Sequence, residues 1–333
     1  MNLAGLIELD DDAENYLTDK TILVTGAQGF IGTTLLSFLS HIDCLIIHSS
    51  RSILAVDPQF SHSRARVFPH QYSKESGWKN LPTFPDIVFY LSGQTNIAFA
   101  HSHPYEDFQT NVSAVVELCD FLAKQRHPAT VIYAGTITQT GISNEVVINE
   151  SAPDTPITFY DFHKLLTETS LNFFNAHTGL RATTVRLPNI YGPGPRSQNQ
   201  SRGIINAVIE KGMEKKPITI YGAGEQIRDY LFIADACRAF ILAAKDIDDL
   251  QGSAFLLSGG SAHTVYEAFS LVCDCIYDKI GFRPPLVRDN DKSLSPIEQR
   301  SYSADSSRFS QITGWKPHFS LRDGINATIE SLL

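Results

Sequence analysis

The fold of this chain is decided by the stretch Thr25-Gly26-Ala27-Gln28-Gly29-Phe30-Ile31-Gly32. An apolar run at 22–24 precedes it and an amphipathic run to Leu39 follows, which predicts a buried strand, a glycine turn and a helix. Glycines let a backbone bend tightly and approach a phosphate, which the first helix amides and the helix dipole then hold. Glycines also occur in ordinary turns, but a strand before and a helix after favour a dinucleotide site.

The composition excludes several classes of protein. With 333 residues, 43% of them hydrophobic, the chain can bury one large core or form two lobes that share a cleft. A net charge of −9 without a basic run argues against nucleic acid or an anionic membrane as a partner. No apolar stretch approaches the roughly 20 residues that span a bilayer, and the acidic start at 10–12 is unlike a signal peptide. The five scattered cysteines are expected to be reduced thiols of a cytoplasmic protein.

Strands and helices alternate along residues 1–187, which we expect to form a dinucleotide-binding domain with an N-terminal extension. Residues 1–19 are a polar segment in which a short helix is expected, and helices are predicted at 105–124 and 160–176. Nearly continuous apolar runs predict strands at 22–24, 44–48, 65–68, 86–91, 130–134 and 182–187. This order predicts an α/β fold, a Rossmann-type doubly wound parallel sheet with helices on both faces.

The pattern changes at Pro188, where prolines and glycines interrupt the alternation. Residues 188–333 are expected to form mainly a smaller α/β substrate-binding lobe over the carboxyl edge of the sheet, where ligands bind in open α/β folds. Residues from about 230 to 260 are expected to return to the first domain. The segment 281–301 is predicted as a loop. Further helices are expected at 203–211, 234–244 and 321–333, and short strands at 218–220, 230–232 and 255–257.

Tyr160 and Lys164 lie one helical turn apart, so their side chains leave the same face of the predicted helix. A lysine ammonium beside a phenol favours the ionised phenol and makes it usable for proton exchange near neutral pH. Alone, such a pair is typical of a solvated helix face. Here the helix follows a strand that ends in Gly135-Thr136-Ile137-Thr138, which places hydroxyl groups at the same sheet edge as the glycine turn.

Several motifs together resemble those of one known family. Residues 25–32 match its T-G-x-x-G-[FY]-[IL]-G loop, residues 160–164 match Y-x-x-x-K, and Thr136 stands where the family has Ser or Thr. Further matches are Asn111-Val112, R-x-x-N-[VI]-Y-G-P at 186–193 and Y-G-x-G-x-Q-x-R-D-[FY] at 221–230. Nearly the whole chain thus resembles the extended short-chain dehydrogenases/reductases that act on nucleotide sugars, including the NAD-dependent epimerase/dehydratase group.

The resemblance implies a role for each matching residue. Tyr160 would be the acid/base at a sugar carbinol, Lys164 would favour its ionised form and bond the nicotinamide ribose, and Thr136 would share the proton path. The implied cofactor residues are Gly26, Gln28, Gly29, Phe30, Ile31, Gly32, Ser50, Arg51, Leu91, Ser92, Gly93, Asn111, Tyr160, Lys164 and Pro188. The implied substrate residues are Gln94, Thr138, Asn189, Arg228 and Arg300. A guanidinium suits a diphosphate because it grips phosphate oxygens bidentately, although Arg300 is open to the alternative of a surface loop residue.

Two departures from the family pattern bear on the reaction. Dehydratases of the family carry an acidic residue just after the catalytic threonine, whereas this chain has the sequence 137–139, Ile-Thr-Gln. Elimination needs a general acid there, so hydride transfer at a ring carbon, most often C4, is expected instead. Where NAD-preferring members place an Asp after the second strand, this chain reads His48-Ser49-Ser50-Arg51-Ser52. Small hydroxyls and an arginine suit a 2′-phosphate, so NADP is favoured over NAD, with a solvated Arg51 as the alternative.

The sequence therefore predicts an NAD(P)-dependent enzyme that acts on a nucleoside-diphosphate sugar as a 4-ketoreductase or a 4-epimerase. The alternatives are a nucleotide-sugar dehydratase and a non-catalytic NAD(P)-binding sensor. A homodimer through the two long helices is implied by the resemblance. No metal is expected, because the pair His101 and His103 lies in a predicted loop without a carboxylate or cysteine at ligand spacing.

Overall fold

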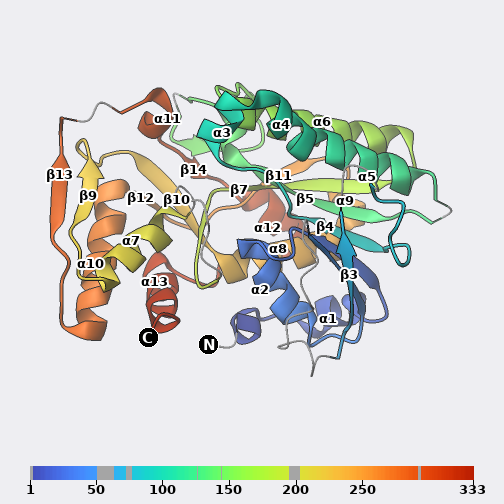
Figure 1. Ribbon diagram of the computed structural model, residues 1–333, viewed down its shortest axis with the longest axis horizontal. Coiled ribbons are helices and arrows are strands. Elements are labelled where there is room, and N and C mark those ends of the chain that lie inside the picture. Colours follow the sequence, from blue (N-terminus) through green and yellow to red (C-terminus); the bar gives the residue numbers. More distant parts are fainter. Residues whose placement is uncertain are drawn as a thin grey trace.

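The computed structural model describes residues 3–50, 64–72, 77–125, 127–143, 145–194, 203–291 and 294–333. At its centre is a seven-stranded parallel sheet with strand order β11-β7-β5-β4-β1-β2-β3 (Figure 1). Its strands are β1 (Thr21–Thr25), β2 (Leu45–Ser50), β3 (Arg66–Gln71), β4 (Ile87–Tyr90), β5 (Thr130–Thr136), β7 (Arg181–Leu187) and β11 (Ala254–Leu256). The predicted doubly wound sheet is confirmed, and the strand order reverses between β1 and β4.

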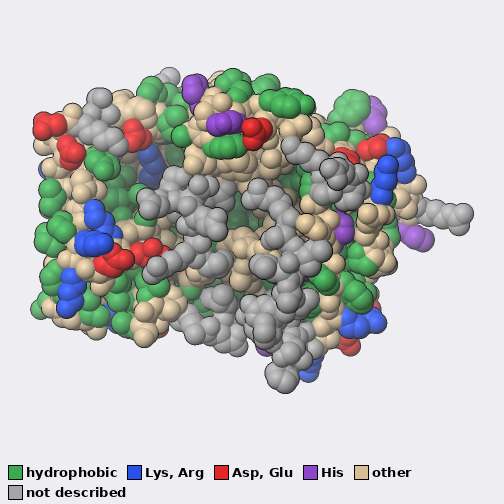
Figure 2. Space-filling model, in the orientation of Figure 1, with side chains coloured by type: hydrophobic (Ala, Val, Ile, Leu, Met, Phe, Trp, Pro, Cys, Tyr) green, Lys and Arg blue, Asp and Glu red, His purple; other side chains and the backbone are tan. Residues whose placement is uncertain are grey.

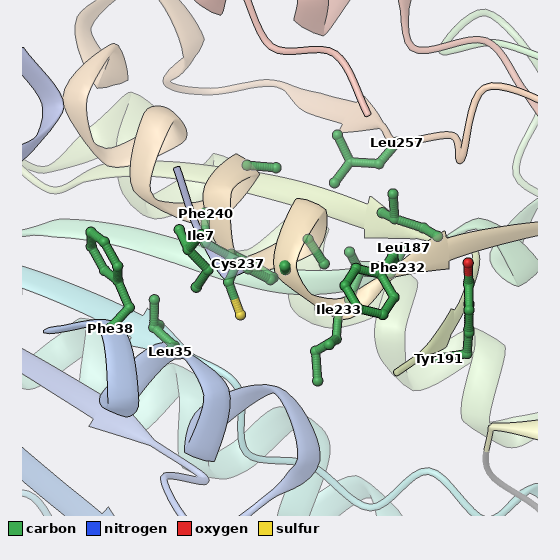
Figure 3. Packing of buried hydrophobic residues seen from close by; sticks show 14 of the residues in the cluster. Ile7, Leu35, Phe38, Leu187, Tyr191, Phe232, Ile233, Cys237, Phe240 and Leu257 are labelled. Atoms are coloured by element: carbon green, nitrogen blue, oxygen red, sulfur yellow. The ribbon is translucent and has the colours of Figure 1, made fainter. Parts of the chain in front are cut away.

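Helices cover both faces of this sheet (Figure 1). The upper face carries α3 (Ile97–Ser102), α4 (Pro104–Phe108), α5 (Ala114–Ala123) and α6 (Phe159–His177), with a π-helical turn at Gln109–Ser113 joining α4 to α5. The lower face carries α1 (Asp11–Leu17), α2 (Phe30–Leu39) and α8 (Ile233–Lys245). Beneath the sheet, Leu35 and Phe38 of α2 pack toward Cys237 and Phe240 of α8 (Figure 3).

The C-terminal lobe lies beside the sheet, at the left in Figure 1, and is built from small sheets and helices. Its sheets pair β8 (Asn189–Tyr191), β10 (Ile227–Phe232) and β12 (Ala262–Thr264), and separately β9 (Ile218–Tyr221) with β13 (Leu286–Asp289). Its main helices are α7 (Ile204–Met213), α10 (Val265–Ile280) and α13 (Leu321–Glu330). Between these elements the chain returns to the large sheet, because α8 covers its lower face and β11 pairs with β7.

Short elements complete the described chain. They are the 3-10 turns at Leu3–Leu6 and Ile137–Thr140, the paired strands β6 (Val147–Ile148) and β14 (Ser303–Ala304), and the helices α9 (Ile247–Leu250), α11 (Pro296–Gln299) and α12 (Ser307–Thr313). No helix within the described ranges is both long and apolar enough to cross a membrane.

Two expectations about local structure are wrong. The segment 281–301, predicted as a loop, contains β13 and α11. His101 lies on the helix α3, where a loop was predicted, because the side chain of Asn96 accepts a hydrogen bond from the Phe99 amide and caps that helix. Both misses concern elements of six residues or fewer, which carry little periodicity of their own.

Candidate active site

The glycine turn lies at the carboxyl end of β1, where the strand order reverses. Gly26 has a φ of +64°, and a Cβ there would lie 2.8 Å from backbone atoms of Ser92. A Cβ at Gly32 would lie 2.3 Å from the carbonyl oxygen of Gly26, so only glycine fits at either position. Gly29 is the N-cap of α2, and because it has no side chain the first amides of the helix stay accessible to an anion. The turn therefore fits the pyrophosphate of a dinucleotide.

The loop after β4 lies against the glycine turn, and side-chain hydrogen bonds hold its backbone at two points. Thr25 Oγ1 accepts hydrogen bonds from the amides of Leu91 and Ser92, each at 3.1 Å. Farther along, Asn111 Oδ1 accepts from the Gln94 amide at 2.9 Å, and Asn111 Nδ2 donates to the Gln94 carbonyl at 2.8 Å. Asn111 therefore holds the backbone of a loop that carries several of the predicted cofactor residues.

Helix α6 places Tyr160 and Lys164 against the end of β5. Lys164 is only 5% exposed, which excludes a solvated helix face for this side chain. Its Nζ donates to the Ala134 carbonyl at 2.8 Å and lies 4.6 Å from the centroid of the Tyr133 ring. A Cβ at Gly93 would lie 3.8 Å from the same Nζ, so the lysine ammonium also borders the loop after β4.

Thr136 ends β5 and is connected to α6 by a chain of polar side chains. Its Oγ1 lies 2.9 Å from Thr138 Oγ1, and Thr138 Oγ1 donates to Asp161 Oδ1 at 2.6 Å. The other oxygen of Asp161 accepts from Arg300 Nη2, also at 2.6 Å. Since Asp161 directly follows Tyr160, this chain brings the threonine and the tyrosine to the same edge of the sheet.

A second buried polar cluster surrounds His163, which directly precedes Lys164 in the sequence. Its Nδ1 lies 2.6 Å from Asp107 Oδ2, and Asp107 Oδ1 accepts from Gln94 Nε2 at 2.6 Å. Surface histidines do gather over α3 and α4 (Figure 2), but His163 is buried and is not among them. Among the residues that the structure describes, no group of three or more His, Cys, Asp and Glu side chains is arranged to hold a metal ion.

The residues predicted to bind a diphosphate, Asn189, Arg228 and Arg300, form hydrogen bonds with other groups of the protein. Arg228 donates to the carbonyl of Glu298 at 2.9 Å and to that of Arg300, and its guanidinium lies 5.6 Å from the centroid of the Tyr302 ring. Asn189 Nδ2 donates to Tyr302 Oη at 2.9 Å. Arg300 is 4% exposed, so the alternative of a surface loop residue is wrong. Contact of these side chains with a substrate stays a prediction.

Three of the remaining predicted cofactor residues belong to the glycine turn and the start of α2. Gln28, Phe30 and Ile31 are half-buried, and a Cβ at Gly194 would lie 2.8 Å from the Phe30 ring. Pro188 is buried directly after β7. Contact of these four residues with a cofactor stays a prediction.

At the end of β2, hydroxyl groups and imidazoles replace the carboxylate found in NAD-preferring members. Ser49 Oγ lies 3.1 Å from His70 Nδ1, and Ser50 ends the strand. Both nitrogens of His48 are buried without a hydrogen-bond partner, and burial lowers the pKa of His48 and of His70. Arg51 lies outside the described residues.

Asp161 was not singled out from the sequence, although its carboxylate connects Thr138 to Arg300 in the structure. It stands inside the quoted stretch 160–164, but a match to Y-x-x-x-K gives its position no weight. Its partner Arg300 is 139 residues away in the chain, so no local spacing announces the pair. An acidic residue in the first turn of a helix is also ordinary, because the helix dipole favours it.

A glycine turn that fits a dinucleotide, together with a Thr, Tyr and Lys trio, is typical of a class of nicotinamide-dependent enzymes. The chain belongs to the NAD-dependent epimerase/dehydratase family, whose sequence pattern matches residues 22–257. Membership confirms the resemblance to the extended short-chain dehydrogenases/reductases that act on nucleotide sugars.

Individual relatives are distant in sequence but alike along their whole length. The chain is 23% identical over 320 residues to a putative UDP-glucose 4-epimerase of Methanocaldococcus jannaschii, covering 92% of this chain and 97% of the relative. The UDP-glucose 4-epimerase of Thermotoga maritima with UDP-glucose has a TM-score of 0.79 at 24% identity, covering 94% and 98% of the two chains. RMD from Pseudomonas aeruginosa complexed with NADPH has a TM-score of 0.75 at 22% identity, covering 94% and 99%. At these identities the structural likeness shows the fold alone.

Proposed function

We propose that this enzyme transfers a hydride at C4 of a nucleoside-diphosphate sugar, as a 4-epimerase or a 4-ketoreductase. The observation that carries the proposal is the burial of Lys164 at the end of β5, beside the loop that borders the glycine turn. The nicotinamide cofactor, when bound, supplies the hydride acceptor and donor. Tyr160 would take a proton from the oxygen on C4 or return it, with Lys164 favouring the ionised phenol and Thr136 sharing the proton path.

The segment after Thr136 supports hydride transfer without loss of water. Ile137 and Gln139 are buried, and Gln139 Nε2 donates to Glu168 at 3.2 Å, so neither offers a general acid to the cleft. The nearby carboxylate of Asp161 is already occupied by Thr138 and an arginine. Mass spectrometry of the product separates the alternatives, because a dehydratase lowers the mass of the sugar by one water and an epimerase leaves it unchanged.

The test of the proposal is Tyr160→Phe, assayed on a panel of nucleoside-diphosphate sugars. Turnover should fall by about 10²- to 10⁴-fold, the usual contribution of a positioned acid/base. Tyr277→Phe, which alters an exposed tyrosine of α10, is the matched control and should leave turnover unchanged. Undiminished turnover by Tyr160→Phe would contradict the assignment. Cofactor binding without turnover of any sugar by the unaltered chain would favour the sensor.

We infer a preference for NADP from the end of β2, where Ser49 and Ser50 stand in place of a carboxylate that would bond the ribose hydroxyls. A carboxylate there would repel a 2′-phosphate, whereas serine hydroxyls can donate to it. NADPH should therefore bind at least about tenfold more tightly than NADH, a difference of about 1.4 kcal/mol. Fluorescence titration measures both affinities, and Ser50→Asp should narrow the ratio while Ser50→Ala leaves NADPH favoured.

We further propose a homodimer in the cytoplasm. Phe162 and Phe173 are 48% and 64% exposed and share one face of α6 with the half-buried Leu166, and hydrophobic side chains also line the upper edge over α4 to α6 (Figure 2). The five cysteines are free thiols, which suits a reducing compartment. Light scattering should give twice the chain mass, and Phe162→Glu with Phe173→Glu should halve it. Tyr277→Glu, on α10, is the control.

A further inference from the structure

A buried ion pair lies directly behind the catalytic threonine and has no part in the proton exchange described above. Asp161 is 0% exposed and Arg300 is 4% exposed, and the paired atoms are 2.6 Å apart. Charges buried this deeply require well-placed partners. The two oxygens of Asp161 are both used, one by Arg300 and the other by the hydroxyl of Thr138. The carboxylate also sits in the first turn of α6, where the helix dipole favours a negative charge.

The ion pair dictates the direction of each hydrogen bond that follows it. A carboxylate paired with a guanidinium accepts and does not donate, so Thr138 gives its only hydroxyl proton to Asp161. The 2.9 Å contact between Thr138 and Thr136 then requires the proton of Thr136. Thr136 Oγ1 also accepts from the amide of Thr138 at 3.3 Å. One lone pair of the Thr136 oxygen is therefore left to accept a further hydrogen bond.

We propose that Asp161 and Arg300 are positioning residues for the catalytic threonine. Acting through Thr138, they hold the hydroxyl of Thr136 in one orientation, with its proton directed to Thr138 and a lone pair left to accept from the phenol of Tyr160 once that phenol carries the proton taken from the sugar. The proposal assigns Arg300 to this chain of hydrogen bonds and not to the substrate diphosphate. It rests on the proposed function, because it concerns the same proton.

The lobe supplies the arginine and keeps it in place. Arg228 donates hydrogen bonds to the carbonyls of Glu298 and Arg300, so the backbone at and just before Arg300 is fixed. Two residues after Arg300, the Tyr302 hydroxyl accepts a hydrogen bond from Asn189 at 2.9 Å. The positioning chain thus links the sheet domain, which contributes Thr136 and α6, to the lobe, which contributes Arg300.

The decisive experiment compares Thr138→Val with Thr138→Ser in the full-length enzyme. Valine keeps the shape but has no hydroxyl, so Thr136 loses the acceptor of its proton, whereas serine keeps the chain intact. We expect Thr138→Val to lower kcat about tenfold or more and to change KM less than about threefold, a loss confined to the proton-transfer step. Thr138→Ser should retain most of the kcat.

Asp161→Asn extends the test to the ion pair. An amide can donate as well as accept, so the direction of the chain is lost at nearly constant volume, and kcat should again fall while KM is held. Because both residues act in one chain, the double variant Thr138→Val with Asp161→Asn should be no slower than the slower single variant. Independent structural damage would instead multiply the two losses. If Asp161→Asn fails to fold, the Thr138 pair decides.

Three results would overturn the proposal. An unchanged kcat for Thr138→Val would show that the chain does not position Thr136. A raised KM with an unchanged kcat for Thr138→Val would show direct substrate binding by Thr138. The same pattern for Arg300→Met would place that arginine on the substrate diphosphate. If the unaltered enzyme turns over no nucleotide sugar, the proposed function fails and the positioning role with it, whereas an active enzyme with an unaffected Thr138→Val variant rejects the positioning role alone.

Discussion

The large sheet and the C-terminal lobe both supply side chains to the candidate active site, but different interactions shape the two parts. On the sheet side, the strands β1 and β4 are buried except at Thr21, the first residue of β1, and the glycine turn between β1 and α2 gets its shape from close backbone contacts. On the lobe side, strands are short and partly exposed, and buried charged side chains hold the backbone. The backbone shape of the sheet side therefore depends on glycines that have no side chain. The backbone shape of the lobe depends on particular charged side chains.

Two aspartates show how the lobe is held. Asp229 is buried, accepts hydrogen bonds from the amides of Gly259 at 2.7 Å and Ala304 at 3.0 Å, and so joins segments from separate parts of the chain. Asp235 accepts from the amides of residues 318 and 319 at 2.8 and 3.1 Å. Burial raises the pKa of Asp229, so these hydrogen bonds must compensate for the loss of hydration.

The largest effect is expected from Gly32→Ala on the sheet side. In an open helix this substitution stabilises by about 1 kcal/mol, because alanine has the better helix propensity. Here the new Cβ would lie 2.3 Å from the Gly26 carbonyl oxygen, so backbone must move and the sign reverses. We expect the free energy of unfolding to fall by about 2–4 kcal/mol, with cofactor binding lost. Urea unfolding and NADPH fluorescence measure the two effects.

Gly179→Ala is the control for that comparison, since a Cβ at Gly179 would meet nothing within 4 Å. It should leave both the stability and the cofactor affinity close to those of the unaltered chain. Normal NADPH binding by Gly32→Ala would mean that the turn does not depend on backbone contact.

The next largest effect is expected from Asp229→Ala on the lobe side. The substitution leaves the half-buried amide of Gly259, the buried amide of Ala304 and the Ser258 hydroxyl without their acceptor. Each unsatisfied group costs about 1–3 kcal/mol, so the free energy of unfolding should fall by roughly 2–5 kcal/mol. Asp229→Asn keeps one acceptor oxygen and should lose less. Equal stabilities of both variants and the parent in urea unfolding would show that the lobe is held by packing instead.

The same contrast explains what could be predicted from the sequence. The sheet was predictable because buried parallel strands are nearly continuous apolar runs, as at 22–24 and 86–91, and because glycine turns leave a spacing that can be recognised. The placement of Thr136 at the end of a strand, and of Tyr160 and Lys164 one turn apart on a helix, was predictable for a related reason, since strand ends and helix periodicity need no long-range information. Their roles in catalysis stay a prediction.

In the lobe, the helices α7 and α13 and the strands β9 and β10 were predicted from apolar patterns, but β13 and the ion pair behind Thr136 could not be predicted in this way. The strand β13 is largely exposed and four residues long, so residues 286–289 have neither an apolar run nor a clear alternation. Asp161 and Arg300 meet only because the folded lobe returns to α6, and burial of the pair follows from tertiary packing and not from local sequence. The side-chain anchors of the lobe are long-range contacts of the same kind.

The smallest effect is expected from His48→Leu, which removes a polar side chain from the sheet side. Both ring nitrogens of His48 are buried without a hydrogen-bond partner, so leucine should leave the free energy of unfolding at pH 8 unchanged or raise it by about 1 kcal/mol. A fall in the free energy of unfolding by more than about 1 kcal/mol would show that the sheet side, like the lobe, relies on a specific polar side chain.

The pH dependence of the stability of His48→Leu separates the effect of losing a titratable imidazole from the effect of changed packing. Burial lowers the pKa of His48 below the value of about 6.5 that it has in the unfolded chain. Below pH 6.5 the unfolded state therefore binds more protons than the folded state, and stability is lost as the pH falls toward the folded pKa. His48→Leu removes this contribution, so its stability relative to the parent should rise between pH 8 and pH 5 in urea unfolding. His41→Gln, at an exposed histidine, should show no such change, and a constant difference for His48→Leu would mean that His48 is not buried as a neutral ring.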